Sequence, residues 1–359
     1  MGATEFGLND ALAVTRWRTD FETEPEKIQY FRKFMGTGPD AMIKIVKDLE
    51  KQAGQEIITA LSMKLSGAGV DGDDIIEGTT AIEGLDFFND TLKINQKRKG
   101  TKSKGKMSEQ RVAYNIRARG RQALSVWFAE EYDEQIIMAL SGARGVDTSF
   151  HNLVGYTGHA GNTFLTPDTA HIVYGGDATA KSDLDSSDII SLDLIDRLVA
   201  KVETMDPQML PFMIDGEKKY VLLMHTFQAF DLRRPLSDND WADIQKRMGA
   251  QSLLFKNALG VWNDVILHKH RNVVRFSDYG ASSTTTAARA LFLGAQAGIM
   301  AWGGQEGGVG RYSWDEKALD AGNQTQIVVG AIFGVKKARY NSKDYSVVAV
   351  DTYYDDPNS

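Results

Sequence analysis

The sequence of 359 residues contains no cysteine, so disulfide bonds, thiolate catalysis and cysteine metal sites are excluded. Long hydrophobic runs are lacking as well. The longest, residues 287–304, is interrupted by Arg289 and Gln296 and is too short to span a bilayer. Residues 1–6 contain neither a basic region nor an apolar run, so we expect no signal peptide and a soluble protein that is made in the cytoplasm.

Signatures of catalysis and cofactor binding are also lacking. The glycine-rich residues 303–310 are not followed by the Lys-Ser/Thr pair of a phosphate-binding loop, and no nucleophile elbow or His-Glu-x-x-His helix occurs. His268 and His270 lie on one side of a predicted strand, but a metal site needs three or four ligands, so we interpret them as surface histidines. We therefore expect no catalytic residue, no cofactor and no metal ion.

The composition is that of a globular protein with many turns. The length allows two or three domains at roughly 100–200 residues each, and an apolar fraction of 42% allows a sizeable core. The 34 glycines exceed the usual share, which indicates many turns.

Charge is distributed in two neighbouring blocks of opposite sign. Residues 70–90 hold seven acids and no base, namely Asp71, Asp73, Asp74, Glu77, Glu83, Asp86 and Asp90. Residues 91–121 hold one acid, Glu109, and eleven bases, namely Lys93, Lys97, Arg98, Lys99, Lys102, Lys104, Lys106, Arg111, Arg117, Arg119 and Arg121. Such blocks mark interaction segments, or a solvated loop beside a solvated helix face. Because Tyr114 is the only aromatic residue in the basic block, a single-strand nucleic-acid platform is not indicated, and nonspecific attraction to phosphate stays open.

The first third of the chain suggests extended segments. Residues 1–38 are polar, poorly periodic and dotted with aromatic residues, which indicates an arm. Residues 39–54 show helical spacing, with a proline in the first turn and a glycine at the end. Residues 57–65 alternate as a strand, and residues 91–104 form a second extended run. Two such runs around a polar tip predict a long hairpin.

The remainder predicts segregated helices and strands. A helix over 108–141, roughly 45 Å long, has a stripe formed by Ile116, Gly120, Leu124, Trp127 or Phe128, Tyr132, Ile136 and Leu140. A second helix begins at Ser191, a short one begins at Ser237, and strands are expected at 220–225, 265–276, 327–335 and 345–353. This mixture is typical of the α+β class.

The arm and the hairpin have no core of their own. Their aromatic residues, including Phe31 and Phe34, therefore need burial by neighbouring chains. The resulting candidates for contacts between chains are Trp17, Phe21, Asp71, Asp73, Asp74, Glu77, Phe87, Phe88, Lys97, Arg98, Lys99, Lys102 and Lys104.

Several runs, in a specific order, carry a likeness to a known family. They are residues 65–70 (LSGAGV), 92–98 (LKINQKR), 106–111 (KMSEQR), 114–117 (YNIR), 220–225 (YVLLMH), 231–233 (DLR), 258–263 (ALGVWN), 289–297 (RALFLGAQA), 334–341 (GVKKARYN) and 347–352 (VVAVDT). Over residues 35 to 353 the chain resembles the N-four-type family of tailed-bacteriophage major capsid proteins.

The resemblance implies the Hong Kong ninety-seven-type (Johnson) capsid fold. It assigns residues 1–38 to an N-terminal arm, 55–106 to an extended E-loop hairpin and 190–330 to an axial domain. The peripheral domain then comprises 39–54, 107–189 and 331–359, with the spine helix at 108–141.

The resemblance also implies a function and partners. The expected function is self-assembly into pentamers and hexamers of an icosahedral shell around double-stranded DNA, in the cytoplasm of a bacterial host. Expected partners are a portal protein, a separate scaffolding protein and, as a further candidate, a decoration protein, without a membrane. Two alternatives stay open: a nanocompartment (encapsulin-like) shell protein and a soluble nucleic-acid-binding module.

Overall fold

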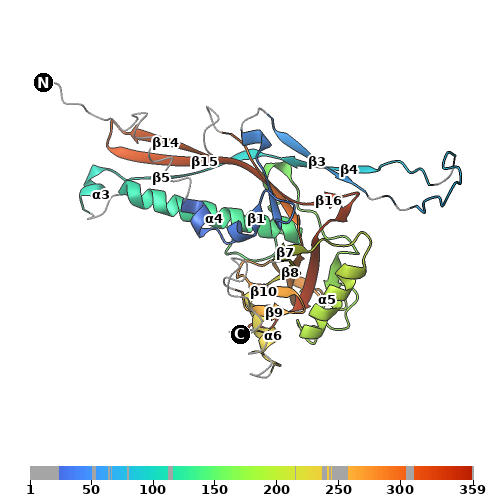
Figure 1. Ribbon diagram of the computed structural model, residues 1–359. Helices are drawn as coiled ribbons and strands as arrows, with labels where there is room; N and C mark the ends of the chain where they lie inside the picture. Colours follow the sequence, from blue (N-terminus) through green and yellow to red (C-terminus); the bar gives the residue numbers. More distant parts are fainter. Residues whose placement is uncertain are drawn as a thin grey trace.

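The computed structural model shows an elongated upper part and a rounder lower part (Figure 1). The residues that it describes are 24–50, 54–63, 65, 67–78, 81–111, 116–214, 216–236, 241, 244, 258–304 and 311–357.

Within these residues, six strands form the sheet of the upper part. The long strand β15 (Gln324–Lys337) lies at its centre because its first half pairs with one strand on each side, β14 (Tyr312–Leu319) and β5 (Asn95–Lys102). Its second half pairs with β13 (Gly298–Trp302). The sheet continues through β2 (Ile43–Val46) to β1 (Met35–Gly36).

The spine helix α4 (Ile116–Ser141) lies along this sheet (Figure 1). Its 26 residues correspond to about 39 Å at 1.5 Å per residue. From Gly120 onward the expected stripe is confirmed, with Gly120, Leu124, Phe128, Tyr132, Ile136 and Leu140 as its buried members. The predicted start of the spine helix at 108 is wrong, because the separate helix α3 (Lys106–Gln110) and a turn at Arg111 come before it. The helix ends at Gly142, which has a φ of +69°. A Cβ there would lie 1.9 Å from the carbonyl oxygen of Leu165, so this turn requires glycine.

The lower part contains a second sheet, of eight strands within the described residues. The closing strand β18 (Val347–Tyr353) is central, as expected, between β6 (Ile172–Tyr174) and β12 (Thr285–Leu293). The other strands are β8 (Glu217–Met224), β10 (Val265–Lys269), β9 (Gly260–Trp262), β11 (Arg275–Tyr279) and β7 (Phe212–Ile214).

Helix α5 (Leu192–Thr204) covers an apolar face of the second sheet. Its predicted cap is confirmed, because the Ser191 side chain accepts the backbone N–H of Leu194 at 3.2 Å. The remaining elements are α2 (Glu24–Ile28), η1 (Phe31–Phe34), η2 (Asp48–Glu50), α3 (Lys106–Gln110), η3 (His159–Gly161), α6 (Thr226–Arg233), β16 (Arg339–Tyr340) and β17 (Lys343–Asp344). The short helix expected from Ser237 falls mostly outside the described residues.

The expected hairpin exists, but its second strand differs from the prediction. β3 (Glu56–Ser62) pairs antiparallel with β4 (Phe87–Lys93), and the loop between them projects from one end of the molecule (Figure 1). The chain then passes the buried Ile94 and continues as β5, which leaves the hairpin and pairs with β15. The prediction of a second strand over 91–104 is therefore wrong, because that run is divided between two sheets.

The predicted helix over 39–54 is also wrong. Residues 43–46 form β2, which pairs in parallel with β13, and a single 3₁₀ turn follows. Four apolar residues within eight positions fit either structure, and pairing with β13 satisfies the backbone hydrogen bonds of an extended segment.

The strands do not follow the domain boundaries expected from the sequence. β13, β14 and the first half of β15 belong to the sheet that packs on the spine helix, although 190–330 was assigned to the axial domain. β18 belongs to the other sheet, although 331–359 was assigned to the peripheral domain.

Candidate assembly surfaces

The loop between β3 and β4 exposes both acidic and apolar side chains. Asp71, Asp73, Asp74 and Glu77 are exposed, and Ile75 is 77% exposed. Other exposed apolar side chains on the loop and its flanks are Leu65, Ile76, Ile82, Leu85 and Phe87, whereas Phe88 is half-buried. Concentrated exposed apolar surface rimmed by charge marks an interaction site. We call residues 65–87 the acidic tip.

The basic residues of β5 are divided between two faces by the pleat of the strand. Lys97 and Lys99 point toward α4, where the Lys99 ammonium lies 5.3 Å from the centre of the Trp127 ring. Arg98 and Lys102 therefore point to the opposite face, and both are exposed. Lys97 is engaged within its own chain, whereas Arg98 and Lys102 present their charges away from α4.

The two charged blocks lie far apart in space although they are neighbours in sequence. The acidic tip projects at one end of the molecule, while β5 and the basic segment that follows it run toward the other end (Figure 1). Lys104, which follows β5, is exposed there. We call the exposed side of β5 with Arg98 and Lys102, together with the adjacent Lys104, the basic face. The acidic tip and the basic face lie at opposite ends of one chain and do not meet within it (Figure 1).

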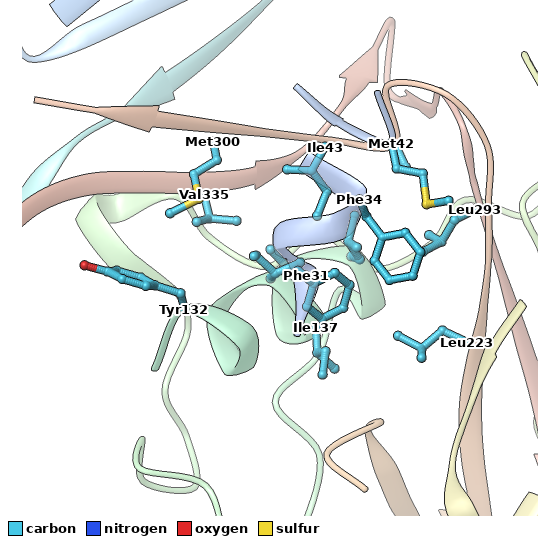
Figure 2. Close-up of a cluster of buried hydrophobic side chains, with 14 of the residues drawn as sticks. Phe31, Phe34, Met42, Ile43, Tyr132, Ile137, Leu223, Leu293, Met300 and Val335 are labelled. Atoms are coloured by element: carbon cyan, nitrogen blue, oxygen red, sulfur yellow. The ribbon is translucent and has the colours of Figure 1, made fainter. Parts of the chain in front are cut away.

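The end of the arm packs on its own chain. Trp17 and Phe21 lie outside the described residues. Phe31 and Phe34, however, are buried in the core beside Ile137 of the spine helix (Figure 2). The expectation that neighbouring chains bury these two rings is wrong, because η1 inserts them between α4 and the two sheets.

Asp133 of the spine helix holds the arm in this position. Its carboxylate accepts the backbone N–H of Tyr30 at 2.8 Å and that of Phe31 at 3.1 Å. At the other end of the segment, Glu24 pairs with Arg121 at 3.0 Å. Burial raises the pKa of Asp133 to about 7, and the two backbone donors offset this only in part.

This raised pKa predicts a pH-dependent stability of the free subunit. A carboxyl group with a folded pKa above its unfolded value stabilises the fold fully below the unfolded pKa and loses that contribution as pH rises through the folded pKa. The window here is roughly pH 4 to 7. We expect wild type to lose on the order of 2 kcal/mol more than Asp133→Asn between pH 5 and pH 8 in urea unfolding. Parallel losses in the two proteins would contradict this role.

The expectation of two surface histidines is wrong for His268, and His270, which follows the strand, is half-buried. His268 is fully buried on β10 and lies edge-on to Phe34, with ring centres 5.3 Å apart. The ring of His270 lies 4.7 Å from that of Tyr30, and burial lowers the pKa of His270 to about 4. Both rings serve the packing of the arm, because η1 covers the strand face that the sequence pattern left open.

A cluster that sequence patterns did not reveal lies along the spine helix. Glu131, Glu134 and His151 bring ligand atoms within 4.8 Å of one another, which is compatible with a metal ion. These atoms already have partners: Glu131 contacts the ammonium of Lys97, and Glu134 accepts the backbone N–H of His151 at 2.9 Å. The arrangement is a hydrogen-bonded ion-pair network in which the Lys97 ammonium supplies the positive charge that a metal ion would otherwise supply.

The described residues add little that would support chemistry or membrane insertion. Tyr279 and Asp133, two groups whose pKa is raised by burial, bind residues of the fold itself: the Tyr279 hydroxyl donates to Asp351, and Asp133 accepts the backbone N–H of Tyr30. The glycine-rich run that ends at residue 310 lies mostly outside the described ranges. None of the helices in the described part of the chain is long and apolar enough to cross a membrane.

Comparison with known proteins identifies the family. A family model described as phage capsid protein matches residues 5–355, nearly the whole chain. The chain belongs to this phage capsid protein family. It is 26% identical to the major capsid protein of Pseudomonas phage KPP25, over 94% of each sequence.

Solved capsid structures agree with the family. The capsid of Ralstonia phage GP4 matches with a TM-score of 0.86 and 39% identity over the full length of both chains. The cyanophage Pam1 capsid matches with a TM-score of 0.72 and 20% identity, covering 91% of this chain and 93% of that one, which supports the fold alone. The α+β capsid fold expected from the sequence is confirmed. The capsid protein is a shell component that assembles from many copies, and its family is a structural one.

Proposed function

We propose that this capsid protein is the major capsid protein of a tailed phage, forming pentamers and hexamers of an icosahedral shell around double-stranded DNA. The full-length likeness to the Ralstonia phage GP4 capsid is the observation that carries the proposal. The exposed acidic tip supports it, because a loop that its own chain leaves uncovered is explained by burial against a second copy.

The contact between copies is an intersubunit clamp. The acidic tip of one subunit, with Asp71, Asp73, Asp74 and Glu77, lies on the basic face of a neighbour that presents Arg98, Lys102 and Lys104. Each exposed ion pair contributes only about 0–1 kcal/mol, and salt screens it over roughly 8 Å. Repetition around a closed shell makes the sum large, while each contact stays weak enough for misplaced subunits to dissociate. The apolar residues beside the acids, among them Ile75 and Phe87, add the burial that charge alone does not supply.

The remaining partners follow from assembly of such a shell. They are a portal protein, a separate scaffolding protein and packaged DNA held without sequence recognition, with a decoration protein as a further candidate. Assembly takes place in the cytoplasm of the host bacterium. The formal net charge of −7 supports loose retention of DNA, since a mildly acidic wall does not attract a polyanion strongly.

Electron microscopy and sedimentation of the purified protein, alone and with its phage scaffolding and portal proteins, test this function. We expect closed icosahedral particles of megadalton size, and particles from infected cells should contain duplex DNA. A protein that stays a small species under all these conditions would contradict the proposal. Closed particles that contain an enzyme cargo in place of DNA would favour the nanocompartment alternative.

A further inference from the structure

A cavity lies where the end of the arm meets the upper sheet and the spine helix. Its wall is built from the end of the arm, β1, β2, the middle of α4, the end of β13 and the start of β14. Its volume is about 380 Å³, which is within the range of small-molecule pockets, roughly 300–1,000 Å³. The cavity is therefore large enough for a small ligand, and one subunit supplies the whole wall.

The charged residues of this wall are all basic. Arg32 comes from η1, Lys47 follows β2 and Arg311 lies just before β14, and none of the described residues that line the cavity is an acid. Glu50, which does not line the cavity, pairs with Arg311 at 3.1 Å. The Arg311 guanidinium also lies 4.9 Å from the centre of the Trp302 ring. A wall of this charge attracts anions and repels cations.

Two buried side chains of the same wall carry hydrogen-bond donors that the fold does not use. Gln29 is 8% exposed and Trp302 is 3% exposed. Neither the Gln29 side-chain nitrogen nor Trp302 Nε1 has an acceptor among the described residues. Such donors are rare in native folds, because burying a donor without an acceptor costs about as much as losing a hydrogen bond. The wall therefore combines positive charge with N–H groups that need an acceptor.

A hydroxyl group adds a further donor to the wall. The Tyr132 hydroxyl points away from Phe31 and Ile137 of the hydrophobic cluster (Figure 2). Burial raises the pKa of Tyr132 well above its usual value, so the hydroxyl keeps its proton. An anion that enters the cavity thus meets donors and no competing negative charge among the described lining residues.

We propose that this cavity binds a phosphate group, either as the free anion or as part of a small molecule. Three bases match the charge of a phosphate dianion better than that of a single carboxylate. The four phosphate oxygens also accept more hydrogen bonds than two carboxylate oxygens do. Arginine binds phosphate through paired N–H donors, and lysine adds a point charge. The Gln29 and Trp302 N–H groups supply the directional donors that a loosely attracted counterion would not need.

A bound phosphate connects the arm to the upper sheet. Gln29 and Arg32 belong to the arm, whereas Lys47 follows β2 and Arg311 precedes β14. A ligand that binds the folded chain alone stabilises it in proportion to its occupancy. The site is complete within one subunit, so its test does not depend on the proposed shell.

Isothermal titration of the full-length free subunit with inorganic phosphate tests the site, with sodium chloride at matched ionic strength as the blank. We expect one saturable site per subunit. Lys47→Gln removes one charge from the wall, and Trp302→Phe keeps a ring but removes the N–H group. Each should weaken binding about tenfold, the typical effect of one hydrogen bond to a charged group. The matched control Lys44→Gln should bind like wild type, because Lys44 lies on β2 but does not line this cavity.

Urea unfolding gives a second measurement that does not rely on a core variant. Phosphate should raise the unfolding midpoint of wild type more than that of Lys47→Gln, since the general stabilisation by phosphate salts is the same for both. Heats no larger than the chloride blank would overturn the proposal. Binding that Lys47→Gln leaves unchanged would also overturn it, because the phosphate would then lie elsewhere. Competition between phosphate and a deoxynucleoside monophosphate for the saturable site distinguishes a nucleotide ligand from the free anion.

Discussion

Shell assembly should fail when Arg98 and Lys102 are both replaced by glutamate, while the free subunit stays folded. Both side chains are exposed on the face of β5 that points away from α4. Surface substitutions of this kind change the free energy of unfolding by about 0.5 kcal/mol or less. Between copies, however, each attraction to the acidic tip becomes a repulsion that is repeated throughout the shell. Sedimentation measures assembly, and urea unfolding of the free subunit measures the fold.

The neighbouring Lys97→Glu is the matched control for this experiment. It makes the same kind of charge change one residue away, but it places a carboxylate against the buried Glu131. We expect it to destabilise the subunit itself by several kcal/mol. A second variant that adds Asp73→Lys and Asp74→Lys to the Arg98 and Lys102 reversals should recover particles. Normal particle yield from the Arg98 and Lys102 variant without rescue would rule out the clamp.

The sequence predicted the elements whose signals are local. The spine helix has one apolar residue on each turn of one face, and Gly142 ends it with a conformation that other residues adopt poorly. Helix α5 begins at a serine whose side chain caps it. In both cases, residues within four positions of one another carry the information, so no knowledge of tertiary contacts was needed.

Elements that depend on distant partners were not predicted. Residues 43–46 become a strand because β13, more than 250 residues later in the chain, pairs with them. The run after Thr91 is divided at Ile94, because the residues that follow Ile94 form β5 and pair with β15. The sequence marks the acidic and basic residues as candidates for contacts between chains, but the separation of the acidic tip from the basic residues of β5 depends on this division.

The same limit applies to single side chains. In the sequence, Phe31 and Phe34 are aromatic residues on a polar arm, and nothing nearby indicates that they are buried. Their burial depends on Asp133, about 100 residues away, which accepts the backbone N–H of Phe31. The position of His268 in the alternating pattern of its strand is typical of a surface residue, but η1 covers that face of the strand. A contact between segments far apart in sequence leaves no periodicity, so neither burial could be derived from the pattern.

The largest effect on the subunit itself is expected at Arg289. This buried residue of β12 lies directly opposite Asp351 of β18, and two guanidinium N–H groups donate to the carboxylate at 2.7 Å each. Another donates to the carbonyl of Ser141 at 2.9 Å, at the end of the spine helix, where helix carbonyls lack partners. Burial alone would lower the pKa of Arg289, but the Asp351 charge raises it above its usual value. The residue thus ties the helix of the upper part to the sheet of the lower part.

We therefore expect Arg289→Met to lower the free energy of unfolding by about 3–5 kcal/mol, because it leaves the Asp351 carboxylate buried without its charge partner. Adding Asp351→Asn should recover part of this loss, since the buried charge is then removed as well. The exposed pair Lys181–Asp278, at 2.6 Å, provides the control, and Lys181→Met should cost no more than about 1 kcal/mol. Urea unfolding of the free subunit measures all three variants. If Arg289→Met costs no more than Lys181→Met, the helix and the second sheet are held together by apolar packing alone, and the ion pair does not carry the connection.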